Sequence, residues 1–212
     1  MTTVLLSGHP GSGKTSILRE LMAGHAVSVA GVISNPLLDE DDRRTGIEAW
    51  LLPGDRRESL AVVAGPPENG RLTRLLAPVD HAAVGLTPGT AQADSILLGP
   101  WRFSRAGFDV VNEHLSGIAA TAASPSTAPV VVIDEVGPLE LARRSGFVTG
   151  FEAVMASSLP AVIVVRPSLL NELSSTICDR WNHRSAGIHS VQVSHPAHIL
   201  PTSRRILAML GA

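Results

Sequence analysis

Continuous apolar runs alternate with amphipathic stretches along the chain, a pattern typical of α/β proteins. The runs show too little polar alternation for half-exposed strands, so we expect strands that helices cover on both faces. Five such strands are predicted, at residues 2–7, 27–34, 129–135, 161–165 and 188–193. The pattern therefore predicts a three-layer α/β sandwich around a mainly parallel five-stranded sheet with right-handed crossovers.

Helices are expected between these strands, because the intervening stretches carry apolar residues on one side at helical spacing. The predicted helices span residues 13–24, 109–123, 147–157, 168–179 and 201–210. Gly24 is a typical helix stop, Ser168 is expected to cap the fourth helix, and Pro201 to open the last.

The segment between the second and third strands has a different pattern. Residues 46–52 and 58–63 indicate two short strands joined by turn-forming residues, so we expect a small β-hairpin excursion over about residues 45–64. From residue 65 to about residue 107, prolines and glycines interrupt every periodicity. Loops of this length are usually functional or mobile. We therefore expect one domain over residues 1–212, with the hairpin and a long loop or lid.

Composition narrows the function classes. The 212 residues are 44% hydrophobic and 17% charged with a net charge of −2, which gives no basic surface for nucleic acid or membrane. Aromatic residues make up only 3%, which argues against a protein that stacks single-stranded bases. The single cysteine, Cys178, excludes an internal disulfide and favours a reduced, cytoplasmic setting. No basic leader is seen, and no apolar run approaches the about 18 residues of a membrane span.

The most informative motif follows the first strand directly. Residues 8–15 read GHPGSGKT and match the phosphate-binding loop G-x-x-x-x-G-K-T. Glycines let backbone N–H groups surround a phosphate, and the helix that follows offers its positive N-terminus to the same anion. Lys14 is expected to reach the β- and γ-phosphates, and the Thr15 hydroxyl to hold Mg²⁺. The residues of this loop predicted to bind nucleotide are Gly8, His9, Pro10, Gly11, Ser12, Gly13, Lys14, Thr15 and Ser16.

Lys14 is the only lysine of the chain, and every other basic side chain except histidine is an arginine. A compact ammonium fits a tight phosphate cradle, whereas the guanidinium of arginine is wider and planar. A general bias toward arginine can deplete lysine, but it does not explain why the remaining lysine lies in this loop. The distribution therefore supports a working phosphate site.

A second motif ends the strand at residues 129–135. Its sequence, PVVVIDE, places Asp134 and Glu135 at the carboxyl end of a parallel strand, where α/β sheets bind ligands. Asp134 is expected to hold the metal together with Thr15 and the phosphates. Glu135 is positioned to polarise an attacking water. Any buried strand can end in acidic residues, so this motif indicates a metal site only in combination with the phosphate loop.

Several residues allow two interpretations. Arg166 directly follows the strand at residues 161–165, so it is a candidate γ-phosphate sensor or arginine finger, or else a surface ion-pair partner. The charged run at residues 39–44 is either a solvated loop or a place where an arginine approaches the phosphates. The aromatic residues of 101–103 either pack the loop onto the core, which we favour, or line a base pocket. The histidines of the last third match no metal-ligand spacing, so ordinary roles are favoured for His183, His189, His195 and His198.

Three segments together resemble the THEP-type nucleoside-triphosphatases, small P-loop NTPases that include the cancer-related nucleoside-triphosphatase group. They are the phosphate loop, RRTGIEAWLL at residues 43–52 and VVVIDEVGPLEL at residues 130–141, of which DEVGPLEL is the most specific. The resemblance covers most of the chain and is weakest over residues 65–101. It implies a P-loop fold in which another strand separates the metal-binding strand from the first strand. It also implies slow, Mg²⁺-dependent hydrolysis of several nucleoside triphosphates with little base preference.

Site residues follow from the resemblance position by position. Glu140 matches the second acidic position of the family, where catalysis and anchoring of the turn by hydrogen bonds are both compatible with the residue type. The metal ligands are expected to be Thr15 and Asp134, and the catalytic residues Lys14, Glu135 and Arg166. The second motif adds to the predicted nucleotide-binding residues Val131, Val132, Ile133, Asp134, Glu135, Val136, Gly137 and Pro138.

The predicted function is Mg²⁺-dependent hydrolysis of ATP, GTP and other nucleoside triphosphates at the β–γ phosphoanhydride, giving NDP and phosphate. One alternative is a small-molecule or nucleotide kinase that uses the same loop. Another is a nucleotide-dependent switch or partner-binding module, in which slow hydrolysis times a conformational state. We expect a nucleoside triphosphate as ligand, Mg²⁺ as cofactor, no membrane and no nucleic acid, in the cytoplasm.

Overall fold

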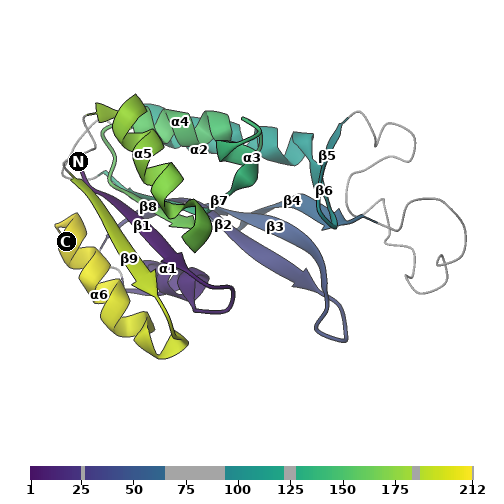
Figure 1. Ribbon diagram of the computed structural model, residues 1–212, viewed down its shortest axis with the longest axis horizontal. Helices are drawn as coiled ribbons and strands as arrows, with labels where there is room; N and C mark the ends of the chain where they lie inside the picture. The colour runs from purple at the N-terminus through teal and green to yellow at the C-terminus, as the bar shows by residue number, and fades with distance from the viewer. Residues whose placement is uncertain (25–26, 65–93, 122–127, 183–186, 212) are drawn as a thin grey trace, which may run out of the picture.

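A mixed β-sheet is the centre of the computed structural model, which describes residues 1–24, 27–64, 94–121, 128–182 and 187–211. Within these ranges the sheet has nine strands in the order β5-β6-β4-β3-β2-β7-β8-β1-β9. Five of them pair in parallel, namely β2 (Val29–Leu38), β7 (Val130–Val136), β8 (Ala161–Val165), β1 (Thr3–Gly8) and β9 (Ile188–Val193) (Figure 1). These five correspond to the predicted strands, and β8 separates β7 from β1 as the resemblance implies. The predicted α/β class is therefore confirmed.

The other four strands are antiparallel and continue the sheet beyond β2, so the sheet is larger than predicted. They are β3 (Arg44–Leu52), β4 (Arg56–Val63), β5 (Ser95–Leu98) and β6 (Trp101–Ser104). The expected hairpin is present as β3 and β4, and it extends an edge of the sheet as expected, because β3 pairs with β2 from Gly31 to Leu38. An exposed edge of β2 is thereby covered.

Strand β2 also runs further than the sequence predicts, through Pro36 to Leu38. Its pairing with β7 ends where Ile33 lies opposite Asp134, whereas its pairing with β3 continues. Proline lacks a backbone donor and is tolerated where one side of a strand has no neighbour. Pro36 therefore does not end the strand, contrary to the expected stop at residue 34.

Residues 95–104 form the β5–β6 hairpin where the sequence predicts a loop. The ring of Phe103 stacks on Phe108 with 5.5 Å between centroids, so the aromatic segment packs onto the core. Residues 65–93, which make up most of the predicted loop or lid, lie outside the described residues.

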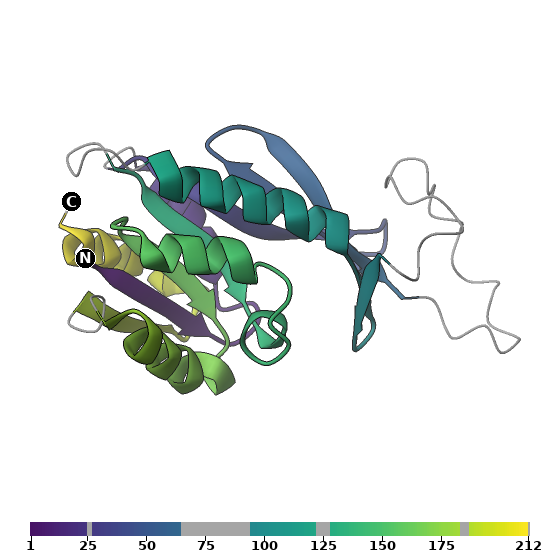
Figure 2. The same cartoon turned by 90° about the horizontal axis from the view of Figure 1, so that it is seen from above.

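Helices cover both faces of the sheet, as the three-layer prediction requires (Figures 1 and 2). One face carries α1 (Lys14–Ala23) and α6 (Ile199–Leu210). The other carries α2 (Arg105–Thr121), α4 (Val148–Ala156) and α5 (Leu170–Arg180). The short helix α3 (Pro138–Leu141) and the 3-10 turns η1 (Pro167–Leu169) and η3 (Pro196–His198) complete the described helices.

Helix ends differ from the predictions in three places. Helix α2 begins at Arg105 rather than residue 109, and α6 begins at Ile199, before Pro201. Ser168 does not cap α5, because it lies inside the turn η1 and the position before α5 is Leu169. Pro167 favours such a turn start, which displaces the helix by two residues.

Successive side chains of each parallel strand point to opposite faces of the sheet, so each strand contributes to the core on both faces. Leu5 belongs to the core cluster that α2, α4 and α5 cover, whereas Val4 and Leu6 belong to the cluster that α1 and α6 cover. This two-sided burial explains why the strands read as continuous apolar runs. None of the helices within the described ranges has the length and apolar character needed to span a membrane.

Candidate active site

The phosphate loop connects β1 to α1 at the carboxyl end of the parallel strands. Gly11 and Gly13 have φ values of 78° and 98°, a backbone region that favours glycine. Gly13 directly precedes α1, so the loop ends at the helix N-terminus, whose free N–H groups attract anions. At Gly8 a Cβ would collide with the backbone carbonyl oxygen of Val193 in β9 and come within 2.6 Å of the Ser12 hydroxyl oxygen, so only glycine fits there.

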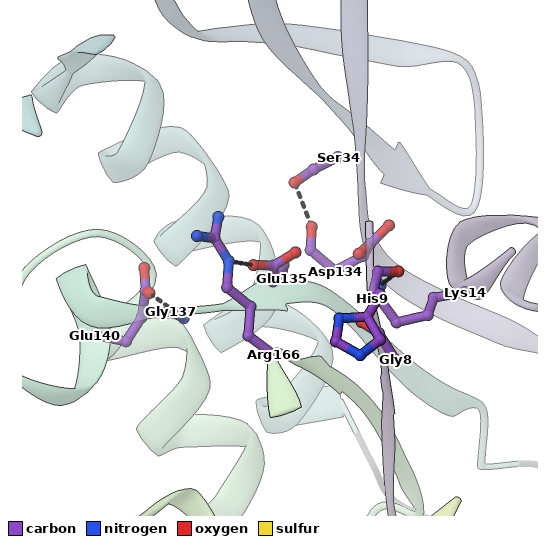
Figure 3. A network of polar contacts seen from close by, with 9 residues as sticks. All are labelled: Gly8, His9, Lys14, Ser34, Asp134, Glu135, Gly137, Glu140 and Arg166. Atoms are coloured by element: carbon purple, nitrogen blue, oxygen red, sulfur yellow. Dashed lines mark hydrogen bonds and ion pairs between the residues drawn. The ribbon is translucent and has the colours of Figure 1, made fainter. Parts of the chain in front are cut away.

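Lys14 lies across this loop and is only 9% exposed. Its Nζ donates to the carbonyl oxygens of Gly8 at 2.7 Å and His9 at 2.9 Å (Figure 3). An ammonium has three N–H donors, so these bonds use two of them. Because carbonyl groups do not neutralise the charge, the lysine keeps its attraction for a phosphate.

Thr15 and Asp134, which lie 119 positions apart in the chain, are in direct contact. The Thr15 hydroxyl donates to Oδ2 of Asp134 at 2.9 Å. Strand β7 positions the carboxylate, and Ser34 of the neighbouring strand donates its hydroxyl to the backbone carbonyl of Asp134 (Figure 3). Hydroxyl and carboxylate oxygens are the ligands that Mg²⁺ prefers, so this pair fits the expected metal.

Burial raises the pKa of Asp134 to about 7, since a charged carboxylate loses its hydration there. The neighbouring charge of Glu135 also raises this pKa. The hydrogen bond from Thr15 and the positive charges of Lys14 and Arg19 lower it. The surroundings of Asp134 thus contain groups that favour its charged form.

Glu135 points toward the same cleft and pairs with Arg166. Nε of Arg166 donates to Oε1 of Glu135 at 2.5 Å, and the Arg166 side chain is 63% exposed (Figure 3). The ion-pair interpretation of Arg166 therefore describes what the structure shows, and its partner is the predicted catalytic glutamate. Both side chains also line the cleft.

Glu140 is buried beneath the turn that follows β7. Its two carboxylate oxygens accept the backbone N–H groups of Gly137 at 2.8 Å and Phe147 at 2.9 Å. Burial raises its pKa to about 7, while these two hydrogen bonds lower it. The structure thus shows the anchoring role of Glu140, which fixes both ends of the α3 segment.

A cleft of about 790 Å³ joins these groups. Arg166 and most of the predicted nucleotide-binding residues line it, namely Gly8, Pro10, Gly11, Gly13, Lys14, Thr15, Ser16, Asp134, Glu135, Gly137 and Pro138. His9 and Ser12 do not line it, and the buried Ser12 hydroxyl has no hydrogen-bond partner among the described residues.

Four predicted nucleotide-binding side chains have no access to the cleft. They are fully buried, 0% exposed, in the two core clusters: Val131, Val132, Ile133 and Val136. These side chains therefore do not line the cleft with the other predicted residues. Their place in a central strand requires them to pack against helices, and they serve the site by holding Asp134 and Glu135 at its edge.

Sequence reasoning missed part of the cleft's polar lining. Arg19 of α1 donates to Oδ1 of the buried Asn35 at 2.6 Å, and both residues line the cleft. Arg19 follows Thr15 by four residues on one helix face, a spacing that gave a usable signal. The charged run at residues 39–44 contains two arginines. Arg44 lines the cleft, whereas Arg43 pairs with Asp41 at 3.0 Å.

The cleft also has an apolar end that the sequence did not predict. Its residues come from several elements between β3 and α4, so no local sequence pattern predicts that they lie together. We call this surface the apolar arm, which comprises Ile47, Leu60, Leu98, Phe103, Phe108 and Phe147.

The histidines give no metal centre within the described ranges, where no three His, Cys, Asp or Glu side chains gather in a suitable group. Nδ1 of His195 accepts the backbone N–H of Ala197 at 3.1 Å, which caps the turn η3. His183 lies outside the described residues.

Comparison with known proteins places this fold. No protein-family model matches the chain. In sequence it is 26% identical over 166 residues to the nucleoside-triphosphatase THEP1 of Methanopyrus kandleri, covering 76% of this chain and 72% of that protein. In structure it matches THEP1 from the hyperthermophile Aquifex aeolicus, with a TM-score of 0.66 and 17% identity over 100% of both chains. It also matches the solution structure of a human cancer-related nucleoside triphosphatase, with a TM-score of 0.65 and 17% identity over 98% of both chains. The chain therefore has the P-loop fold of these proteins, and its resemblance to the THEP-type nucleoside-triphosphatases is confirmed.

Proposed function

We propose that this chain hydrolyses nucleoside triphosphates to nucleoside diphosphate and phosphate. The observation that carries the proposal is the contact between Thr15 and Asp134 beside Lys14, within one cleft. The similar protein of Methanopyrus kandleri is named a nucleoside-triphosphatase, which supports the same activity here.

The loop residues 8–16 bind the triphosphate through backbone N–H groups and the N-terminus of α1. Lys14 adds a positive charge at the β- and γ-phosphates. These groups are held in place before the reaction. They therefore need not move to stabilise the negative charge that develops on the phosphate oxygens. Positioning and electrostatics supply most of the catalysis of phosphoryl transfer.

Thr15 and Asp134 hold Mg²⁺ in this proposal. A bound Mg²⁺ would neutralise negative charge on the β- and γ-phosphate oxygens. Asp134 must be ionised to serve as ligand, and the nearby charges of Lys14 and Arg19 favour that form.

Glu135 orients the attacking water and takes its proton as the water oxygen bonds to the γ-phosphorus. The bond from the γ-phosphorus to the bridging oxygen breaks, and the nucleoside diphosphate leaves. Arg166 holds the Glu135 carboxylate through their ion pair and is the proposed γ-phosphate sensor.

Glu135→Gln tests this assignment. The variant keeps the size of the side chain but removes the proton acceptor, so phosphate release should fall by about 10²-fold or more. ATP affinity, measured by calorimetry, should change by less than about threefold. Glu152→Gln is the matched control, because Glu152 pairs with Arg144 and Arg180 and does not line the cleft. Unchanged hydrolysis in Glu135→Gln with ATP still bound would reject the role.

Phosphate release from ATP, GTP, CTP and UTP, with and without Mg²⁺, tests the substrate class. We propose similar rates for the four triphosphates, because the assigned contacts involve the phosphates and not the base. Chelation of Mg²⁺ should abolish phosphate release.

We also propose a cytoplasmic location. The single cysteine of the chain supports it, because proteins of oxidising compartments commonly carry disulfides.

A further inference from the structure

The apolar arm lines the cleft on the far side of β7 from the phosphate loop, and two of its rings, Phe108 and Phe147, are only 4% and 3% exposed. Phe108 and Phe147 belong to the core cluster under α2 and α4, and Phe103 packs against it. The rings of Phe108 and Phe147 meet edge to face at 5.4 Å between centroids, and Phe103 stacks on Phe108. This packing holds the three rings in place, so the arm does not have to form when a ligand arrives.

The direction of the nucleotide excludes its own base from the arm. The phosphate loop follows β1, whereas Asp134 and Glu135 end β7, two strands away, and the arm lies beyond them over β3, β4 and β6. The lysine and the metal-binding threonine of a P-loop contact the β- and γ-phosphates. Since the partner of Thr15 is Asp134, the γ-phosphate is the end nearest β7. The α-phosphate and the nucleoside therefore extend away from the arm.

The volume and chemistry of the cleft leave a place for a second molecule. Ligand pockets range over about 300–1,000 Å³, and this cleft of about 790 Å³ includes both the phosphate end and the arm. Such pockets combine apolar walls with a few polar groups that orient the ligand. Here Asn35, held by Arg19, and Arg44 line the same cleft.

We propose that the apolar arm binds a second small molecule, one that carries a flat, mainly apolar ring and a short polar group, together with the nucleotide. The ring packs on the phenylalanine side chains, and the polar group points toward Glu135 and Asn35. The orientation argument depends on the proposed nucleotide site, so the test must measure the two sites separately.

The four phenylalanines of the chain provide the reporter. Phe103, Phe108 and Phe147 line the arm, whereas Phe151 packs against Trp181 at 5.7 Å and does not line the cleft. Incorporation of 4-fluorophenylalanine gives one ¹⁹F resonance for each position, which single Phe→Leu variants assign. The probe is 2-naphthylmethanol, titrated with and without a non-hydrolysable ATP analogue and Mg²⁺.

The probe should shift the resonances of the three arm residues saturably and leave that of Phe151 unchanged. Its affinity should be the same within about twofold when the ATP analogue is bound. The proposal is overturned if the probe shifts none of the three resonances, or if the analogue itself shifts them and displaces the probe. The second outcome would assign the arm to the base of the nucleotide.

Leu98 and Leu97 give a matched pair of variants. They are neighbours on β5, but Leu98 lines the arm, whereas Leu97 is 54% exposed and does not line the cleft. Leu98→Gln should weaken probe binding about fivefold through lost apolar contact, and Leu97→Gln should not change it. Equal effects of the two substitutions would overturn the assignment.

Phosphate release from ATP in the same samples separates the two proposals. Probe binding without any hydrolysis or nucleotide binding would reject the proposed function and leave a ligand site in the arm. Hydrolysis without probe binding would support the proposed function and reject the ligand site.

Discussion

Lys14 is held by backbone carbonyl groups, and this arrangement defines what the residue can do. A carboxylate partner would neutralise the ammonium, whereas Gly8 and His9 orient it and leave its charge for a phosphate. Its burial means that a larger side chain has little space to adjust. Charge and size are therefore separate requirements at this position.

Substituting Lys14→Arg keeps the charge and changes the shape. The planar guanidinium does not fit between the two carbonyl groups as the ammonium does, so ATP affinity should fall by about tenfold or more. Calorimetric titration with ATP and Mg²⁺ measures this loss. Binding equal to that of the unmodified chain would show that the tight cradle imposes no size limit.

Thr15→Val tests the pairing of the hydroxyl with Asp134. Valine has nearly the same shape, so the change removes one hydroxyl and its donation to the carboxylate. The Mg²⁺ concentration for half-maximal phosphate release should rise by about 10- to 100-fold, as when a group that orients a metal site is lost. Thr176→Val is the control, because the Thr176 hydroxyl bonds its own helix at the carbonyl of Glu172. Equal Mg²⁺ dependence in both variants would contradict the metal assignment.

Glu140 links pH to stability. Its pKa is raised from 4.5 to about 7 in the folded chain, so the folded state binds this proton more tightly than the unfolded state. The stabilising contribution is present below pH 4.5 and is lost as the pH rises through about 7. The loss is on the order of 3 kcal/mol.

Glu140→Gln removes this titration. Denaturant unfolding at pH 5, 6, 7 and 8 gives the free energy of unfolding for both chains. The stability of the unmodified chain relative to the variant should decrease across this range. A difference that stays constant or increases with pH would show that the carboxylate does not take up a proton on folding.

At the scale of elements, the close approach of β2 to β7 sets the geometry of the site edge. Gly31 has a φ of 124°, and a Cβ there would collide with the backbone carbonyl of Val132. This contact brings Ser34 next to Asp134 farther along the same two strands. The glycine therefore serves the site through the register of the sheet.

Gly31→Ala should destabilise the chain by about 2 kcal/mol or more, because the backbone must shift and the residue must keep an unfavourable φ. Gly117→Ala is the matched control, since Gly117 lies in α2 and a Cβ there meets nothing within 4 Å. That control should gain about 0.5–1 kcal/mol from helix propensity. Chemical unfolding measures both, and equal effects would refute the close-packing argument.

The same scale shows how far the sequence predicts the structure. Continuous apolar runs reveal β1, β2, β7, β8 and β9, because a central parallel strand is buried on both faces. The hairpin β5–β6 was missed, since its four-residue strands are interrupted by Gly99 and Pro100 and gain their stability from pairing with β4. The strand conformation of that segment thus depends on tertiary pairing, which no local sequence pattern encodes.

The site also has residues that the sequence predicts and residues that it does not. The phosphate loop and the Asp134 motif were visible because their chemistry requires particular residues at fixed spacing. Arg19 could have been inferred, because it lies one helical turn after Thr15 on the same helix. Asn35 and the apolar arm were not visible, because their proximity depends on strand order and on how β2 and β3 extend past the neighbouring strand.

At the scale of the whole molecule, the proposed nucleotide site joins segments that lie far apart in the chain. Thr15 belongs to α1 on one face of the sheet, whereas Asp134 lies in the central strand β7, 119 positions later. A ligand that contacts both segments stabilises the folded chain as a unit, since the unfolded chain offers no such site.

Thermal unfolding with a non-hydrolysable ATP analogue at 100 times its dissociation constant should therefore show a gain of about 2.7 kcal/mol. For a chain of this length that gain raises Tm by about 5–10 °C. In Asp134→Asn the amide is a poorer ligand for a divalent cation, so the additional increase caused by Mg²⁺ should disappear, while part of the increase caused by the analogue alone remains. An equal Mg²⁺ increment in both chains would place the cation away from Asp134 and would remove the link between β7 and the phosphate loop on which the proposed chemistry depends.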